Sequence, residues 1–375
     1  MDYPLVWAEI DLNAIKHNIK ILKNLIPKNT KFMAVVKADA YGHGTVKVAQ
    51  KAIQSGADML GVARLHEAQE LRDAGISVPI LIFGFIFPNQ LETLANLDLT
   101  ATIYDYKIAK QLSIQACKKS ITIKAHLKID TGMGRLGILL DSKNRSVSNI
   151  KEIINLPQID IQGIYTHFAS ADSLDKSYCE NQIEVFTDFL NKLKQQGIEF
   201  KTKHAANSAA IINFPKSHFD LVRAGLAMYG LYPNLEMQNN EQINLKPVLK
   251  LKAIITSIKK VPKGFNISYG MTYQTKNKTT IASVPIGYAD GFSRLLSSKG
   301  CMLVNGKRAP IVGRICMDQT LIDIGLMSDV KIGDEVVIIG SQGKETITAE
   351  EVALKASTIN YEVVSSLTSR VPKFY

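Results

Sequence analysis

The sequence predicts an α/β fold, in which a (β/α)8 barrel of the TIM type is followed by a mainly β C-terminal domain. Residues 11–233 alternate short apolar runs with amphipathic helical segments, the pattern of repeated β-α units. After Pro233 the pattern changes to short alternating strands separated by turn signals. The chain has 375 residues, which suits a large barrel with an appended domain.

Eight apolar runs are the expected strands of the barrel. Each parallel strand needs a crossover helix, and about eight tilted strands close such a sheet. The competing fold is an open doubly wound sheet, but its usual GxGxxG fingerprint after the first strand is missing. The eight runs are residues 32–36, 59–62, 80–83, 99–103, 121–129, 159–165, 200–204 and 219–222.

Helical patterns lie between these runs. Before the first run, apolar residues at positions 15, 19, 22 and 26 fall on one helix face, and Asp11 is placed to cap that helix. Residues 178–195 repeat the helical pattern before the seventh run.

The C-terminal part alternates apolar residues with lysines over residues 249–255, which is a strand period. Asn305-Gly306 between two apolar runs predicts a hairpin, because both positions tolerate positive φ. Thr348 and Glu351 have the spacing of a capping box at the start of a late helix. We therefore place the barrel at 11–233 and the β domain at 234–375, with the polar stretch 234–244 as the linker.

The formal net charge is +11, which raises the question of a nucleic acid or a membrane as partner. The lysines are scattered, and no run of five or more basic residues occurs. We interpret the charge as a solvated basic surface, so that nucleic-acid binding is the weakest of the functional hypotheses and no membrane partner is expected.

The cysteines and the apolar runs indicate a cytoplasmic protein without a metal site. The four cysteines form no CxxC pair, and no histidine cluster has metal-ligand spacing. The N-terminus lacks the basic stretch and apolar core of a secretory signal. The longest apolar run, residues 80–87, is far shorter than the ~20 residues of a membrane span.

The first expected strand leads directly into Lys37, which a glycine-interrupted turn follows. The C-terminal ends of barrel strands form the active-site face. An amine held there against apolar surroundings loses solvation, which lowers its pKa and makes it nucleophilic. Lys37 is therefore a candidate Schiff-base lysine, although a surface lysine at a strand end is an equally good interpretation of this residue alone.

Polar residues at the other strand ends favour the functional interpretation. The loops after the seventh and eighth strands are the usual phosphate site of such barrels, which fits Ser208 and the turn 223–226. The residues that share the expected barrel mouth are Lys37, Lys128, Arg135, His167, Asn207, Ser208 and Arg223.

Residues 34–44 resemble the cofactor-lysine signature of the alanine racemase family. Further motifs of that family follow in order and cover nearly the whole chain, at residues 130–137, 165–169, 206–210, 222–231, 267–273, 287–291, 316–320 and 360–364. The resemblance implies a pyridoxal 5′-phosphate enzyme that interconverts L-alanine and D-alanine, supplying D-alanine for peptidoglycan. It also implies that residues 1–10 join the β domain and that a homodimer shares its active sites between subunits.

The resemblance further implies the role of each site residue. Lys37 would carry the cofactor covalently and act as one catalytic base. Arg223 would contact the pyridine nitrogen, with His167 supporting it. The phosphate would be held by Tyr41, Ser208, Tyr361 and the backbone of Gly225 and Leu226, and Asn207 completes the cofactor set.

Racemisation needs a proton removed on one face of the α-carbon and returned on the other. The resemblance implies that Tyr269 from the partner is the second base. A tyrosine needs nearby positive charge for that role, and Arg135, which would also bind substrate, is the candidate source. The backbone of Met317 would bind the substrate carboxylate, and Lys128 matches a position that is carbamylated in many relatives. His43 and His204 are expected to be structural.

Three alternatives remain open at this point. A broad-specificity amino-acid racemase of the same fold differs only in a few side chains at the entrance. A barrel-type decarboxylase would pair the pyridine nitrogen with a carboxylate, whereas the matching position is Arg223. A cofactor carrier without catalysis would lack the β domain that contains Tyr269.

Overall fold

The protein was analysed as a computed structural model, which describes residues 4–141, 145–234, 236–237, 243–325 and 327–375. The chain divides into two compact units. One comprises Ile15–Ala40 and Thr45–Lys246, and the other comprises Met1–Ala14, Tyr41–Gly44 and Pro247–Tyr375. Part of the predicted linker, residues 235 and 238–242, lies outside the described residues.

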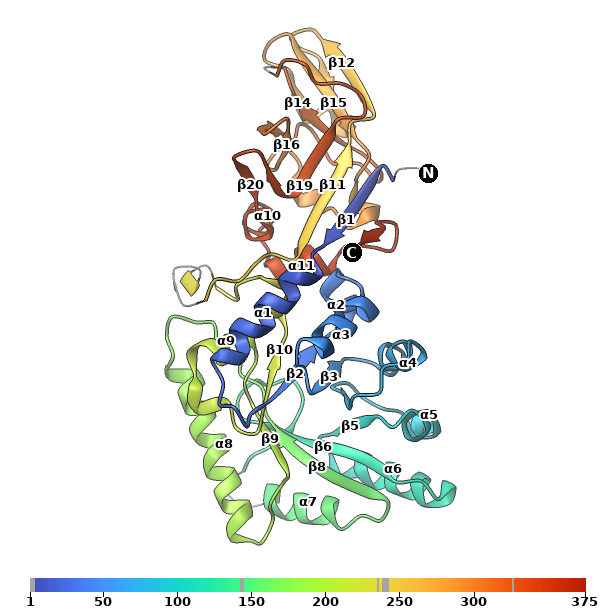
Figure 1. Cartoon of the computed structure of the whole chain (residues 1–375), viewed down its shortest axis with the longest axis vertical. Coiled ribbons are helices and arrows are strands. Elements are labelled where there is room, and N and C mark those ends of the chain that lie inside the picture. The colour runs from blue at the N-terminus through green and yellow to red at the C-terminus, as the bar shows by residue number, and fades with distance from the viewer. Residues whose placement is uncertain (1–3, 142–144, 235, 238–242, 326) are drawn as a thin grey trace. The chain divides into compact units, whose positions relative to one another are not determined.

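The first unit contains eight parallel strands in the order β10-β2-β3-β4-β5-β6-β8-β9 (Figure 1). Their bounds are β2 (Lys31–Val35), β3 (Met59–Val62), β4 (Ile80–Ile82), β5 (Thr100–Ile103), β6 (Ile123–Asp130), β8 (Ile159–Tyr165), β9 (Thr202–His204) and β10 (Leu221–Ala224). A short strand β7 (Ile138–Leu139) pairs with β6. The predicted barrel is confirmed.

Hydrogen bonds between β9 and β10 link the two ends of this sheet. The Asp220 N–H donates to the Lys203 carbonyl at 3.0 Å, and the Arg223 N–H donates to the Ala206 carbonyl at 3.0 Å. The predicted strand 219–222 begins two residues too early, because Phe219 has a φ of 43° and lies outside the β region.

Helices connect the strands, as parallel pairing requires. They are α1 (Leu12–Asn24), α2 (Lys37–Gly42), α3 (Thr45–Gln54), α4 (Leu65–Asp73), α5 (Leu91–Asn96), α6 (Tyr106–Lys119), α7 (Arg145–Ile154), α8 (Ser177–Gln195) and α9 (Ser208–Asn213). The predicted cap of α1 is confirmed, since Asp11 Oδ1 accepts the N–H groups of Asn13 and Ala14. Inside the barrel, Met33, Met59, Leu81, Tyr165 and Leu221 form a buried cluster.

The second unit is mainly β. Its largest sheet has the order β17-β16-β19-β11-β1-β21, and β20 pairs with β19. The N-terminal strand β1 (Val6–Ile10) pairs antiparallel with β11 (Leu249–Ile254). The other strands of this sheet are β16 (Cys301–Val304), β17 (Lys307–Pro310), β19 (Glu335–Gln342), β20 (Glu345–Ile347) and β21 (Lys373–Phe374). The Asn305-Gly306 hairpin is confirmed between β16 and β17.

Smaller elements complete this unit. A three-stranded sheet contains β12 (Ser257–Val261), β15 (Thr279–Val284) and β18 (Thr320–Asp323), and β13 (Asn266–Ile267) forms a hairpin with β14 (Tyr273–Gln274). Val261, Ile267, Ile281 and Val312 pack into a buried cluster there. Two late helices are α10 (Ala349–Ala356) and α11 (Asn360–Ser365).

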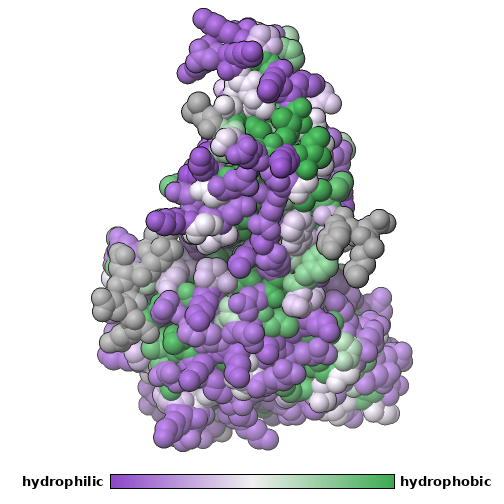
Figure 2. Space-filling model, turned by 45° about the horizontal axis from the view of Figure 1, so that its top comes forward, coloured by the Kyte–Doolittle hydropathy of each residue, from purple (hydrophilic) through white to green (hydrophobic). Residues whose placement is uncertain are grey.

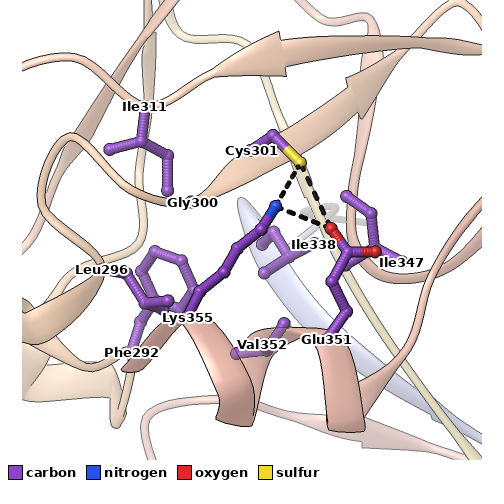
Figure 3. Close-up of a pocket in the computed structure, with 10 residues that line it drawn as sticks. All are labelled: Phe292, Leu296, Gly300, Cys301, Ile311, Ile338, Ile347, Glu351, Val352 and Lys355. Carbon is purple, nitrogen blue, oxygen red and sulfur yellow. Dashed lines mark hydrogen bonds and ion pairs between the residues drawn. The ribbon is translucent and has the colours of Figure 1, made fainter. Parts of the chain in front are cut away.

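A small pocket beside α10 is lined by apolar side chains and one charged cluster (Figure 3). Thr348 caps α10 by accepting the Glu351 N–H, as the predicted capping box requires. The Glu351 carboxylate is used elsewhere, because it pairs with Lys355 and Arg308 at 2.7 Å each. Lys355 Nζ also lies 3.4 Å from the thiol of Cys301, one of four free cysteines. This cluster is an ion-pair network that joins α10 to β16 and β17.

The face in Figure 2 is covered mostly by hydrophilic side chains, with hydrophobic ones in smaller groups between them. Among the described residues, no helix combines the length and apolar composition that crossing a bilayer requires.

The contribution to stability of the contact between the β9 and β10 segments, which closes the barrel, can be tested by substitution. Asp220 Oδ2 accepts the Lys203 N–H at 2.8 Å, so Asp220→Ala removes the partner of a backbone donor. We expect the free energy of unfolding to fall by about 1–2 kcal/mol in urea denaturation. The control is Asp160→Ala, because the Asp160 carboxylate binds Gln162 on its own strand and should change stability by less than about 0.5 kcal/mol. Equal effects of the two substitutions would argue against a role of Asp220 in closing the sheet.

Candidate active site

The candidate site of the first unit is built at the C-terminal ends of the barrel strands. Lys37 follows β2 directly, Lys128 lies near the end of β6, and His167 follows β8. Asn207 and Ser208 follow β9, and Arg223 lies in β10. Because the strands are parallel and β9 is linked to β10, these ends meet at one mouth of the barrel. The predicted gathering of polar residues is therefore present in the fold.

Lys37 begins a single turn of left-handed helix, α2. Four consecutive non-glycine residues, Ala38 to Tyr41, have φ values of 53°, 52°, 51° and 55°. This conformation costs an L-residue roughly 1–2 kcal/mol, so tertiary contacts must hold the turn. The Ala38 N–H donates to Glu67 Oε1 at 2.7 Å, and Asp39 Oδ1 accepts the Thr45 N–H at 3.0 Å. The sequence predicts a turn here but not its handedness.

The amine of Lys37 is half-buried and has a lowered pKa. Loss of solvation on burial is the main cause, and the positive charge of Arg135 lowers the pKa further, while the Glu67 carboxylate opposes both effects. Arg135 itself lies in the exposed loop after β6. An amine of lowered pKa at the barrel mouth is the property expected of a nucleophilic lysine.

Arg223 is only 4% exposed, and both terminal nitrogens of its guanidinium have hydrogen-bond partners. Its Nη2 donates to the carbonyls of Thr166 and Ala205, and its Nη1 lies 2.8 Å from His204 Nδ1. His167 Nδ1 also lies 3.2 Å from Nη2, as its expected supporting role requires. Burial lowers the pKa of Arg223 to about 10, so the guanidinium stays charged at neutral pH.

The donor-only chemistry of arginine sets the proton positions in the histidines behind it. His204 Nδ1 must accept from Arg223, so the neutral ring carries its proton on Nε2. That Nε2–H then donates to His126 Nδ1 at 2.9 Å. Burial and the charge of Arg223 lower the pKa of His126 to about 4 and that of His204 well below its usual value, so both rings stay neutral.

Tyr165 and Lys128 fill the floor of the same mouth. The Tyr165 ring stacks on His204 with centroids 4.6 Å apart, and Arg223 and Lys128 lie over it at 5.3 and 5.6 Å. Lys128 is 4% exposed, and burial together with Arg135 and Arg223 lowers its pKa to about 8. Most of this amine is therefore charged at neutral pH, with a minor uncharged fraction that grows as the pH approaches 8.

Backbone donors converge around Ser208 at the start of α9. The N–H groups of Gly225 and Ala227 donate to Ser208 Oγ at 2.9 and 3.2 Å, with Leu226 between them. Asn207 caps α9 by accepting the Ala210 N–H at 3.0 Å. N–H groups arranged around a hydroxyl in this way are a suitable cradle for an anion.

Tyr269 and Met317, two further predicted site residues, belong to the second unit. Tyr269 is 72% exposed and Met317 is 53% exposed. Their segments adjoin, since Ser268 Oγ donates to the Arg314 carbonyl at 2.5 Å. The chain around Tyr269 is strained, with positive φ at Ser268 and Met271.

Tyr41 and Tyr361 also lie in the second unit. Their ring centroids are 6.3 Å apart. Burial and the nearby Tyr361 raise the pKa of Tyr41 far above its usual value, so this hydroxyl stays protonated and can donate a hydrogen bond.

Sequence reasoning missed three residues that contact the predicted ones. Glu67 holds the turn after Lys37, His126 extends the Arg223 network, and Tyr165 stacks within it. His204, expected to be structural rather than catalytic, contacts Arg223 directly. Tyr165 and His204 do lie at the ends of predicted strands, and that position is the one signal in the sequence that could have indicated their role.

A parallel barrel whose mouth holds a lysine of lowered pKa and a buried arginine defines a class of barrel enzyme built around an amine nucleophile. Comparison with known proteins specifies the family. Residues 10–233 match the N-terminal domain model of alanine racemase, and residues 248–375 match its C-terminal domain model. The chain belongs to the alanine racemase family, as its motifs predict.

Relatives match over 95% or more of their length. The chain is 48% identical to the alanine racemase of Methanococcus maripaludis, covering 99% of this chain and 98% of that protein, and 50% identical to that of Desulforamulus reducens, with the same coverage. The crystal structure of alanine racemase from Bacillus anthracis with bound L-Ala-P is 41% identical with a TM-score of 0.94, over 100% of this chain and 95% of that one. The alanine racemase of Clostridium difficile 630 is 39% identical with a TM-score of 0.93, over 100% and 96%.

The lowered pKa of Lys128 makes stability depend on pH. Below pH 8 the buried amine is charged and destabilises the fold, and between pH 8 and 10.5 the folded protein loses this proton before the unfolded chain does. The cofactor-free protein in bicarbonate-free buffer should therefore gain up to about 3 kcal/mol relative to Lys128→Met over that range. Urea denaturation at pH 7 and 10.5 measures the difference.

The control for this experiment is Lys124→Met on the same strand. The Lys124 side chain is partly exposed, in contrast to that of Lys128, so its substitution should change the difference in stability between the two pH values much less than Lys128→Met does. A Lys128→Met difference that is the same at both pH values would contradict the assigned shift.

Proposed function

We propose that this protein is a racemase that interconverts L-alanine and D-alanine with pyridoxal 5′-phosphate, bound covalently by Lys37. The observation that carries the proposal is the Lys37 amine of lowered pKa at the mouth of a barrel of this family. The donor set fits the cofactor, because it combines an amine for the aldehyde, a charged arginine and a cradle of backbone N–H groups.

Each part of the cofactor has a matching set of residues. In the barrel unit, Ser208 and the backbone of Gly225 and Leu226 would hold the phosphate. Asn207 fixes α9, which carries Ser208. Arg223 donates to the pyridine nitrogen, held in place by His167 and His204. When bound, the cofactor withdraws electrons from the substrate α-carbon, which makes its proton removable.

Arg223 favours racemisation over the decarboxylase alternative. Its guanidinium only donates hydrogen bonds, so it would leave the ring nitrogen of a bound cofactor unprotonated, and that ring would withdraw electrons less strongly than one paired with a carboxylate. The three histidines near Arg223 are His126, His167 and His204. The pKa of each is lowered, so all three are neutral, and none is an acid strong enough to protonate the ring nitrogen of the cofactor. A weak electron sink suits a reaction that returns the proton quickly.

Two bases act on opposite faces of the α-carbon. Lys37 is one, and Tyr269 of a second copy of the chain is the other. Arg135, whose charge acts on both Lys37 and Lys128, supplies positive charge near the tyrosine and binds substrate. The Met317 backbone binds the substrate carboxylate. Lys128 is a candidate for carbamylation, because a pKa lowered to about 8 leaves part of its amine uncharged and able to react with carbon dioxide.

Exposed side chains of the β unit support a homodimer with shared sites. Four large side chains of this unit are exposed, those of Tyr269, Met271, Tyr288 and Met317. Hydrogen bonds to the Arg314 and Cys316 carbonyls join the segments that carry them. Apolar surface of this kind commonly marks a protein interface. A second copy that covers it places Tyr269 within a site that one chain leaves incomplete.

The activity is tested by chiral product analysis of the purified protein with each of a panel of L-amino acids. The protein should absorb visible light from its bound cofactor and convert L-alanine to an equal mixture of enantiomers. Conversion of several other amino acids at comparable rates would favour the broad-specificity racemase instead. A colourless sample that stays colourless after the cofactor is added would contradict the proposal.

Lys37→Ala should abolish both the visible absorbance of the bound cofactor and turnover, because it removes the covalent attachment and one base. Spectra and chiral analysis measure the two losses. Lys31→Ala, at the exposed start of the same strand, is the control and should retain both. Racemisation retained by Lys37→Ala would remove the assignment.

Tyr269→Phe should slow wash-in of solvent deuterium mainly at the α-hydrogen of the L-enantiomer. The phenolic hydroxyl is the only group removed, so the face served by Lys37 keeps its base. Measuring exchange from each enantiomer separately tests this, with Tyr273→Phe as the control. Equal losses from both enantiomers would leave the two-base scheme unsupported.

A further inference from the structure

The buried carboxylate of Glu67 lies beneath the turn that follows Lys37. Glu67 is on α4 and is 9% exposed. Its Oε1 accepts the Ala38 N–H at 2.7 Å, and its Oε2 accepts the N–H groups of Ala63 and Arg64 at 2.7 and 2.9 Å. One carboxylate therefore joins the residue next to Lys37 to the end of the neighbouring strand β3.

Only an ionised carboxylate suits this position. All three partners are backbone N–H donors, so both side-chain oxygens must accept. A glutamine of the same shape would turn an NH2 group towards at least one donor and lose that bond. Bonds from N–H groups to a carboxylate are also shorter and stronger than neutral ones, which agrees with the 2.7 Å distances.

The turn needs such an anchor because its residues disfavour its conformation. Ala38, Asp39 and Ala40 all have φ near 50°, although none is glycine. Glu67 binds the turn at its first peptide after Lys37, and Asp39 binds it to Thr45 at the other end. Without the first anchor, the peptide that follows Lys37 is free to relax towards negative φ and to move the amine.

We propose that Glu67 is a positioning residue, which fixes the left-handed turn after β2 and thereby the place and direction of the Lys37 amine. The inference rests on the proposed function of Lys37. It differs from a purely electrostatic role, because the Glu67 charge favours the protonated amine and its removal alone would make Lys37 a more readily available base. Loss of position lowers the rate, whereas loss of charge alone raises or preserves it.

The test is Glu67→Gln in the full-length holoenzyme, with two readouts. Hydrogen–deuterium exchange of the peptide that covers residues 36–44 reports on the turn itself, independently of activity. Turnover of alanine reports on the amine. We expect hydrogen–deuterium exchange of this peptide to be roughly 10-fold or more faster than in the parent protein, and kcat to be roughly 10-fold or more lower. Both changes correspond to the loss of a hydrogen bond to a charged group. KM should stay within about twofold of the parent value.

Two further variants make the result specific. Glu70→Gln removes another carboxylate from the same helix, whose pKa is raised by burial and then by Asp39 and Glu67, and it should leave both readouts within about twofold. Ala38→Gly in the Glu67→Gln background should restore at least about threefold in kcat, because glycine adopts positive φ without steric cost.

The outcomes separate the proposal from its alternatives. Unchanged exchange and unchanged kcat in Glu67→Gln would overturn it, as would a higher kcat, which would indicate a role through charge alone. If Glu67→Gln fails to fold, Glu67→Asp keeps the carboxylate on a shorter stem, and unchanged exchange in that variant overturns the proposal. If the protein does not racemise alanine, the exchange readout still decides the role of Glu67.

Discussion

The concentration of positive charge at the mouth of the barrel is the constraint on which the rest of the site depends. Closing eight parallel strands places their C-terminal ends together, and here three of those ends carry Lys37, Lys128 and Arg223. Each of the two lysines has its pKa lowered by burial and by neighbouring cations. The repulsion among these groups is relieved by an anion, so the fold prepares both a nucleophilic amine and a place for a phosphate or a carboxylate.

The same charge explains why the histidines of the site do not act as acids. His126, His167 and His204 all lie close to Arg223, and protonating any of them would place a second cation in a buried network. Their role is instead to accept and pass on hydrogen bonds in a fixed order, which orients the guanidinium. Tyr165, stacked on His204, adds an aromatic face to which the cations are attracted. The proton chemistry is thus left to the lysine and to the proposed tyrosine.

Much of the fold could be predicted from the sequence, because it depends on periodicity. The eight strands recur at the predicted places, and Asp11 and Thr348 cap the helices that they precede. The gathering of polar residues at strand ends follows from the parallel sheet itself.

The supporting contacts could not be predicted. Glu67 lies in an ordinary helical pattern, and only the packing of α4 against β3, beside the turn that follows Lys37, reveals that its oxygens accept three backbone donors. The His126–His204 contact depends on the relative register of β6, β8 and β9, which no pattern within one strand encodes. The roles of individual residues came from the family resemblance rather than from periodicity.

Both proposed bases lie on turns where non-glycine residues have positive φ. Ala38 to Tyr41 follow Lys37 in this conformation, and Ser268 and Met271 flank Tyr269 with φ values of 62° and 51°. Strain of this kind persists only where surrounding contacts over-determine the backbone. Around Lys37 those contacts are the carboxylates of Glu67 and Asp39, and around Tyr269 they include the Ser268 hydroxyl bound to the Arg314 carbonyl.

A relaxed turn would direct each side chain as an ordinary strand or loop does. A strained turn holds the side chain of the base in a direction that a relaxed backbone would not allow. A reaction that needs two bases on opposite faces of one carbon atom tolerates little error in either direction, which is a physical reason for locating both groups on rigid, strained turns.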